Sequence, residues 1–147
     1  PPQQVGAGCN NSSSTGGALL SGSGSASVAA DALLISVAGT KPTATTVLLQ
    51  GHTELSLGSG GVAFGQGLRC VGGTLLRLYV TGAVGGAANF PPTGSNSISA
   101  RSAALGDSLT AGSRRVYMAY YRDPIVSGGC PVSATFNATN ALSVAWN

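Results

Sequence analysis

The stretch RRVYMAYYRD, residues 114–123, carries the clearest strand signal in the chain. Its apolar residues form two interleaved sets, one starting at Val116 and the other at Tyr117, each occupying every second position. This period of two is typical of a β-strand, whose successive side chains point to opposite faces. The same alternation recurs at residues 75–80 and 142–146. Each of these strands has an apolar face, which two stacked sheets would bury.

The rest of the chain repeats this pattern more weakly. From Ala18 onward, short apolar runs follow one another, each bounded by Gly, Pro, Ser or Asn. This organisation predicts an all-β fold, a single antiparallel β-sandwich or jelly roll over residues 18–147. Helix is limited to one or two turns within residues 99–109. Residues 1–17 show no periodicity and are expected to form a flexible tail or linker.

The composition favours contact with other protein surfaces. Charged residues make up 7% of the chain and hydrophobic residues 43%, and there are 23 glycines. Small, weakly hydrated side chains must therefore form the surface, and they let a second surface approach without desolvating ions. The net charge of +3 comes from arginines scattered between Arg69 and Arg122, not from a dense basic stripe, so no nucleic-acid partner is expected.

The three cysteines predict a disulfide and an oxidising, extracellular location. Cys70 follows a strand-like run and Cys130 follows a turn, and a bridge between them would stabilise the fold by about 4 kcal/mol. Cys9 then has no partner within the chain, and would pair with a cysteine upstream or in a neighbouring molecule, or stay free. Without C-x-x-C spacing, and with His52 as the only histidine, no metal or cofactor site is expected. No membrane span is expected, since the longest apolar run is far too short.

Residues 106–109, Gly-Asp-Ser-Leu, resemble the nucleophile block of the GDSL esterases and lipases. In that family the block follows a first buried parallel strand, and a D-x-x-H block near the end of the domain supplies the base. Here no histidine follows Ser108, and a serine hydroxyl is a poor nucleophile without a base. The only histidine, His52, lies far upstream, and it could act as the base only if the fold brought it next to Ser108. The favoured interpretation is a turn in which Asp107 binds the loop backbone, so no catalytic residue and no enzyme activity are predicted.

The acids and the aromatic residues are the remaining candidates for a functional site. The acids occur singly, so nothing indicates the carboxylate pair of a glycosidase; they are Asp31, Glu54, Asp107 and Asp123. Aromatic residues with neutral polar neighbours could form a platform for glycans, although most are expected in the core; they are Tyr79, Tyr117, Tyr120, Tyr121 and Trp146. Glycan binding or adhesion therefore remains an alternative function.

Several segments resemble a domain of secreted proteins from planctomycetes and related bacteria. They are GAGCNNSSSTGGALL (6–20), FGQGLRCVGG (64–73), SISARSAALGD (97–107), YYRDP (120–124), GGCP (128–131) and FNATNALSVAW (136–146). The resemblance implies a secreted, cysteine-bridged β-domain and transfers no active site. It also implies that Cys9 pairs with a cysteine that this sequence lacks.

The function expected from these observations is structural. A sheet-rich chain with few charges lacks the usual protection against edge pairing, which suits a non-catalytic extracellular subunit of a filament, sheath or surface layer. Such a homo-oligomer or polymer could form if residues 1–17, or the apolar run ADALLISV at 30–37, added a strand to a neighbour's sheet. The alternatives are the glycan-binding module and, as a weaker one, a GDSL-like esterase.

Overall fold

A computed structural model describes residues 6–55, 62–125 and 135–147, and it confirms the all-β sandwich. Every pairing among the described strands is antiparallel. One sheet has three strands in the order β1 (Leu19–Ser23), β2 (Leu34–Ala38) and β9 (Ala87–Phe90). The other has four, in the order β11 (Phe136–Ala145), β10 (Arg114–Arg122), β3 (Thr45–Gly51) and β8 (Leu76–Gly82).

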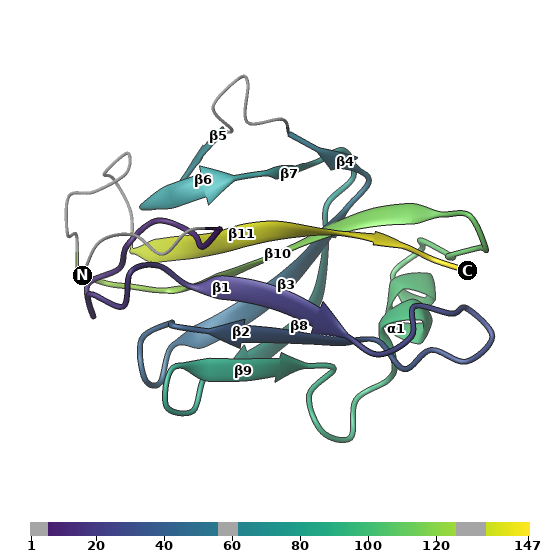
Figure 1. Ribbon diagram of the computed structural model, residues 1–147, viewed down its shortest axis with the longest axis horizontal. Coiled ribbons are helices and arrows are strands. Elements are labelled where there is room, and N and C mark those ends of the chain that lie inside the picture. Colours follow the sequence, from purple (N-terminus) through teal and green to yellow (C-terminus); the bar gives the residue numbers. More distant parts are fainter. Residues whose placement is uncertain (1–5, 56–61, 126–134) are drawn as a thin grey trace.

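Two short strand pairs add a layer beyond the sandwich. They are β4 (Thr53–Glu54) with β7 (Val71–Gly72), and β5 (Val62–Phe64) with β6 (Gly67–Arg69). Figure 1 shows both pairs on one side of the four-stranded sheet, with β1, β2 and β9 on the other side. The four-stranded sheet is therefore covered on both faces.

The alternation in β10 divides its side chains between two cores. Tyr117 and Tyr121 point into the main core, where they pack with Ile35 of β2 and Leu48 of β3. Met118 belongs to the other set, which packs under the outer layer with Leu49, Val71, Val116 and Ala138. Because β10 is an interior strand of a sheet covered on both faces, neither of its sets is polar.

One short helix, α1 (Ile98–Ala104), joins β9 to β10. The Ser97 hydroxyl accepts a hydrogen bond from the amide of Ala100 and caps the first turn. Ile98 is fully buried and ties the helix to the main core. The helix ends before Gly106, whose φ of 96° favours glycine.

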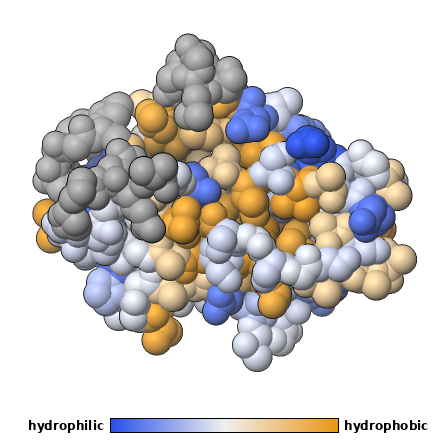
Figure 2. Space-filling view, in the orientation of Figure 1, coloured by the Kyte–Doolittle hydropathy of each residue, from blue (hydrophilic) through white to orange (hydrophobic). Residues whose placement is uncertain are grey.

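The surface reflects the low charge content. In Figure 2, strongly hydrophilic residues lie in separate small groups among neutral and apolar ones. No helix among the described residues is long and apolar enough to span a bilayer.

Candidate functional site

The Gly-Asp-Ser-Leu block is an anchored turn in the structure. Arg115 Nε donates to Asp107 Oδ2 over 2.7 Å, and Arg115 Nη2 donates to Oδ1 over 2.6 Å. Gln50 Nε2 also donates to Asp107 Oδ2, and the Ser102 hydroxyl donates to the Asp107 carbonyl oxygen. The hydrogen bonds from Arg115 are the main cause that lowers the pKa of Asp107 to about 2. The Asp107 carboxylate thus ties the turn to β10 and β3, whereas the prediction was a bond to its own loop backbone.

His52 faces this carboxylate and not Ser108. Its Nε2 lies 3.0 Å from Asp107 Oδ2, and its side chain is 41% exposed. Ser108 is exposed beside a shallow depression between α1 and the segment around Asp31. Among the described residues, Ser108 has no hydrogen bond to a side chain that could act as its base. The arrangement supplies a stable turn but not an activated serine.

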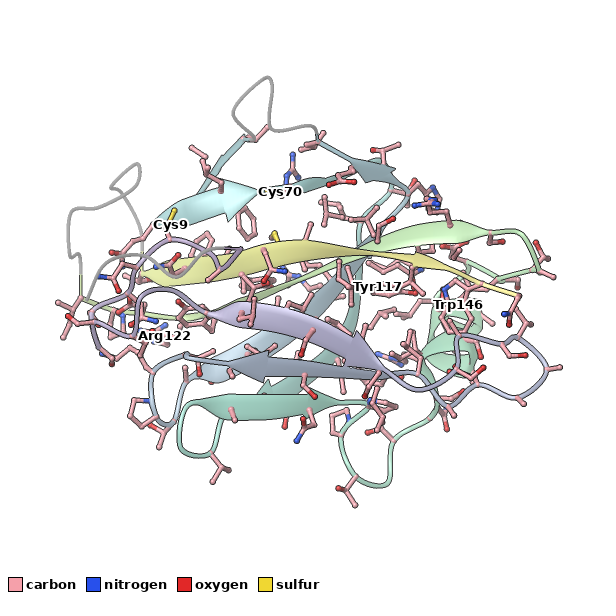
Figure 3. All side chains as sticks on the ribbon, in the orientation of Figure 1. Cys9, Cys70, Tyr117, Arg122 and Trp146 are labelled. Atoms are coloured by element: carbon pink, nitrogen blue, oxygen red, sulfur yellow. The ribbon has the colours of Figure 1, made fainter. Side chains whose placement is uncertain are left out.

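The predicted Cys70–Cys130 bridge is wrong, because Cys70 is a free thiol. Burial, and to a lesser extent the charge of Glu54, raise the pKa of this thiol. Cys9 is 5% exposed and disulfide-bonded, but not to Cys70. Figure 3 shows Cys9 on the N-terminal part of the chain and Cys70 just beyond the end of β6. Cys130 lies outside the described residues.

The aromatic residues proposed for glycan binding do not form an exposed platform. Tyr79, Tyr117, Tyr121 and Trp146 are each 7% exposed or less. Tyr117 and Trp146 lie together (Figure 3), where the indole Nε1 donates to the tyrosine hydroxyl over 3.1 Å. Tyr120 packs edge-to-face against Phe64 and Phe136 in a half-buried cluster. The four buried side chains therefore offer no stacking surface to a sugar, whereas Tyr120 is partly exposed beside an open depression.

The described residues contain no group of three or more His, Cys, Asp or Glu side chains that could hold a metal ion.

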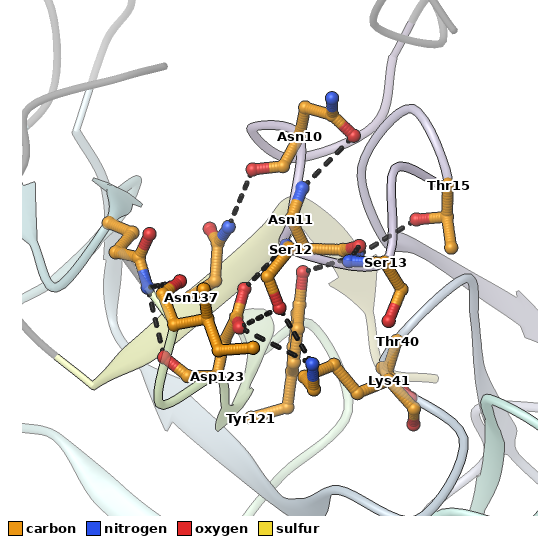
Figure 4. A network of polar contacts seen from close by, with 12 residues as sticks. Asn10, Asn11, Ser12, Ser13, Thr15, Thr40, Lys41, Tyr121, Asp123 and Asn137 are labelled. Atoms are coloured by element: carbon orange, nitrogen blue, oxygen red, sulfur yellow. Dashed lines mark hydrogen bonds and ion pairs between the residues drawn. The ribbon is translucent and has the colours of Figure 1, made fainter. Parts of the chain in front are cut away.

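The N-terminal segment, residues 8–17, is held by a buried polar network (Figure 4). Asp123 is 0% exposed, and its carboxylate accepts hydrogen bonds from the amide and the hydroxyl of Ser12. Lys41 Nζ donates to the Ser12 hydroxyl over 2.7 Å and lies 3.9 Å from Asp123 Oδ1. A buried charge needs such partners, because its desolvation is otherwise costly.

Two asparagines complete the attachment. Asn11 Nδ2 donates to the Tyr121 hydroxyl and to the carbonyl oxygen of Gly39. Asn137 Nδ2 donates to the carbonyl oxygen of Asn10 over 2.9 Å. The segment is thereby bound to β10, β11 and the loop after β2, so the expectation of a flexible tail is wrong for residues 8–17. Of residues 1–17, positions 1–5 lie outside the described residues.

In this structure the described parts of the two predicted donor segments are bonded within their own domain. Residues 8–17 are attached to their own domain. The run at 30–37 contains most of β2, the middle strand of its sheet, which pairs with β1 on one side and β9 on the other. Donating either segment to a neighbour would break these contacts within its own domain.

One side of the sandwich has covered strand edges. At the β1 edge, the amide of Leu20 donates to Asn140 Oδ1, and Asn140 Nδ2 donates to the Leu20 carbonyl oxygen. A side-chain amide thus takes the place of a neighbouring strand. The β11 edge meets the N-terminal segment through Asn137, and β6 through the hydrogen bond from the Gln66 amide to the Phe136 carbonyl oxygen.

The other side of the sandwich has an open edge at β8. Just beyond the two strands, the amide of Ala83 donates to the Ala44 carbonyl oxygen, so Ala44 and Ala83 form a hydrogen-bonded pair. This bond shows which of the residue pairs between β3 and β8 are hydrogen-bonded. Such pairs alternate in an antiparallel ladder, so the Thr46–Thr81 pair is hydrogen-bonded and the Val47–Val80 pair is not. The main-chain groups of Val80, and by the same alternation those of Gly82, therefore point away from β3. We call Val80–Gly82 the open strip.

The ends of the open strip are defined by neighbouring contacts. On one side, Arg101 Nε donates to the Leu78 carbonyl oxygen over 2.8 Å and occupies that outward group. On the other, the main-chain groups of Val84 bond to those of Ala87. Shallow depressions flank β8, with volumes of about 430 Å³ beside Leu78–Val80 and about 290 Å³ beside Thr81–Gly82. The Val80 side chain is 61% exposed.

No family model, curated protein or solved structure matches this chain. The resemblance to the planctomycete family of secreted, cysteine-bridged domains is therefore wrong as an assignment, and the free thiol of Cys70 contradicts the bridge drawn from the sequence. The roles of Asn140 and Arg101 at the strand edges could not be predicted from the sequence. No local pattern marks them, because each acts on a strand distant in the sequence.

Proposed function

We propose that this protein is a non-catalytic structural protein that assembles with copies of itself outside the cell, by strand pairing at the open strip. The observation that carries the proposal is the β8 edge, where Val80 and Gly82 direct main-chain groups outward, whereas the opposite edge strand, β11, contacts β6 and the N-terminal segment at its start. Unpaired strand edges are templates for pairing with another chain.

The side chains of the strip support this function. Natural proteins protect exposed edges with charged residues, especially Lys, or with Pro. Val80, Thr81 and Gly82 include neither, and the chain's single lysine, Lys41, binds Ser12 at the N-terminal segment. Val80 also offers apolar surface to a partner strand. Pairing would use the edge without changing the core.

The chemistry of the other candidate sites supports a non-catalytic role. The one His–Asp contact belongs to a turn anchored by Arg115, and Ser108 lies outside it. Ser12, Lys41 and Asp123 satisfy one another around a buried carboxylate, and none of them lines a described cavity. Both networks hold segments of the chain in place.

The experiment is light scattering after size-exclusion chromatography, over a wide range of concentrations, with electron microscopy of the most concentrated sample. We expect the mass to rise above the 14.3 kDa of one chain. Val80→Pro should prevent the rise, because it removes an outward amide that β3 does not use, and proline is tolerated at strand edges.

Val80→Thr is the matched control, because it changes the side chain and keeps the amide. Thermal unfolding should show that both variants fold. A wild-type protein that stays monomeric throughout contradicts self-assembly, and assembly that Val80→Pro leaves intact excludes the β8 edge. Secretion is tested separately by fractionating the source cells and their medium.

A further inference from the structure

We infer that two copies pair β8 with β8 in antiparallel orientation about a two-fold axis at Thr81, forming a closed dimer. This inference rests on the proposed function and names the partner, the register and the number of copies. It is drawn from the hydrogen-bonding groups that the edge leaves open.

The register follows from which outward groups are free. In a new antiparallel contact, each hydrogen-bonded pair must join residues whose main-chain amide and carbonyl point away from β3 in both copies. With the axis at Thr81, Val80 faces Gly82 of the second copy, and Gly82 faces its Val80. The outward amides and carbonyls of Val80 and Gly82 in both copies are then all used, in four hydrogen bonds counted from these two pairs.

A different register uses the edge less well. Moving the axis to Val80 would place Leu78 opposite Gly82 of the second copy. The Leu78 carbonyl oxygen already accepts from Arg101 Nε. Moving the axis to Gly82 would place Val80 opposite Val84 of the second copy. The amide and carbonyl of Val84 already bond to Ala87. Only the axis at Thr81 leaves both existing contacts intact while using Val80 and Gly82 of each chain.

The side chains fit this register. Val80 is 61% exposed, and a Cβ added at Gly82 would meet nothing within 4 Å, so each valine enters open space beside the partner's glycine. Thr81 lies opposite Thr81 of the second copy, and threonine pairs are favourable across antiparallel strands. The strip carries no charge, so two copies of net charge +3 meet there without opposed like charges.

This symmetry sets the size of the unit. A contact in which the same strip lies on both partners is isologous, and it closes at two copies. Each open strip is consumed by the pairing, and an eight-stranded sheet results from two copies of the order β11, β10, β3 and β8. A larger assembly would have to join these dimers through another surface.

The test is cross-linking in a Cys70→Ser background. Thr81→Cys places two thiols at a non-hydrogen-bonded pair, where Cα atoms approach to about 4.5 Å and a disulfide can form. We expect Thr81→Cys to give a covalent dimer of twice the 14.3 kDa chain on mild oxidation. Val84→Cys is the control: it is 83% exposed but pairs with position 78 in this register, so it should cross-link far less.

Hydrogen exchange gives a second measurement on the unmodified protein. On concentration, the amides of Val80 and Gly82 should exchange at least about tenfold more slowly, while the Thr81 amide, which already bonds within the sheet, should change little. Assembly without Thr81→Cys cross-linking and without this alternating protection overturns the register but leaves the proposed function standing. A mass above two copies that depends on the same strip overturns the closed pair. A monomer at every concentration overturns both proposals.

Discussion

Asp107→Asn should weaken the fold at neutral pH and have little effect in acid. The native carboxylate binds Arg115 through two hydrogen bonds and has a pKa of about 2, below its usual 3.8. At about 1.4 kcal/mol per pH unit of pKa difference, this lowering corresponds to at most about 2.5 kcal/mol. Because the Asp107 side chain is 15% exposed and solvent screens the pair, we expect about 1–2 kcal/mol.

The sign follows from the direction of the pKa change. A carboxyl group whose pKa is lowered by folding stabilises the native state above its unfolded pKa, and this contribution is lost as the pH falls through the folded pKa. The wild type should therefore lose its advantage over Asp107→Asn between about pH 5 and pH 2.

The assay is urea unfolding at a series of pH values, followed by the fluorescence of Trp146, the only tryptophan, which is buried. Glu54→Gln serves as the control, because Glu54 is exposed and forms no ion pair among the described residues. A stability difference between wild type and Asp107→Asn that is the same at pH 7 and pH 2 would refute the electrostatic account.

Three further predictions concern other parts of the fold. Asp123→Ala should cost about 3 kcal/mol and speed hydrogen exchange across residues 8–17, because it leaves Lys41 and Ser12 without their buried acceptor; unchanged exchange there would contradict the anchoring role. Asn140→Ala should cost about 1–2 kcal/mol in urea unfolding and increase aggregation on storage, because it exposes the β1 edge at Leu20; an equally soluble variant would show that the edge is protected by other contacts. Cys70 should react with iodoacetamide more slowly than a free cysteine at neutral pH, because its pKa is raised, and the rate should climb with pH; rapid labelling at neutral pH would contradict this.

The strands could be predicted from the sequence where burial imposes a period of two. In β10, two interleaved apolar sets indicate both the strand and its place inside the sheet. The helix was placed correctly, because its small residues lie between Ser97 and Gly106. What local patterns cannot show is which strand lies beside which, so the cysteine pairing was wrong.

The candidate sites depended still more on contacts between distant residues. A Ser- and Asn-rich stretch such as 10–15 is typical of a linker, yet here its side chains bind Asp123 and Tyr121, more than a hundred positions away. The one available signal was the acid that follows β10, since a carboxylate at the end of a core strand needs donors from elsewhere. The turn at Asp107 was predicted, but the reason given for it was wrong: the carboxylate binds Arg115 and Gln50 and not its own loop backbone.

The attachment of residues 8–17 also bears on how the molecule behaves toward proteases. A single cut between Gly8 and Ser12 would separate no domain, but it would loosen the groups that satisfy a carboxylate inside the protein. The loss of stability would then affect β10 and β11, which the N-terminal segment contacts, and not only the site of the cut. The amino-terminal peptide thus contributes to the stability of the sandwich, and we expect a cut within it to lower the free energy of unfolding of the whole domain.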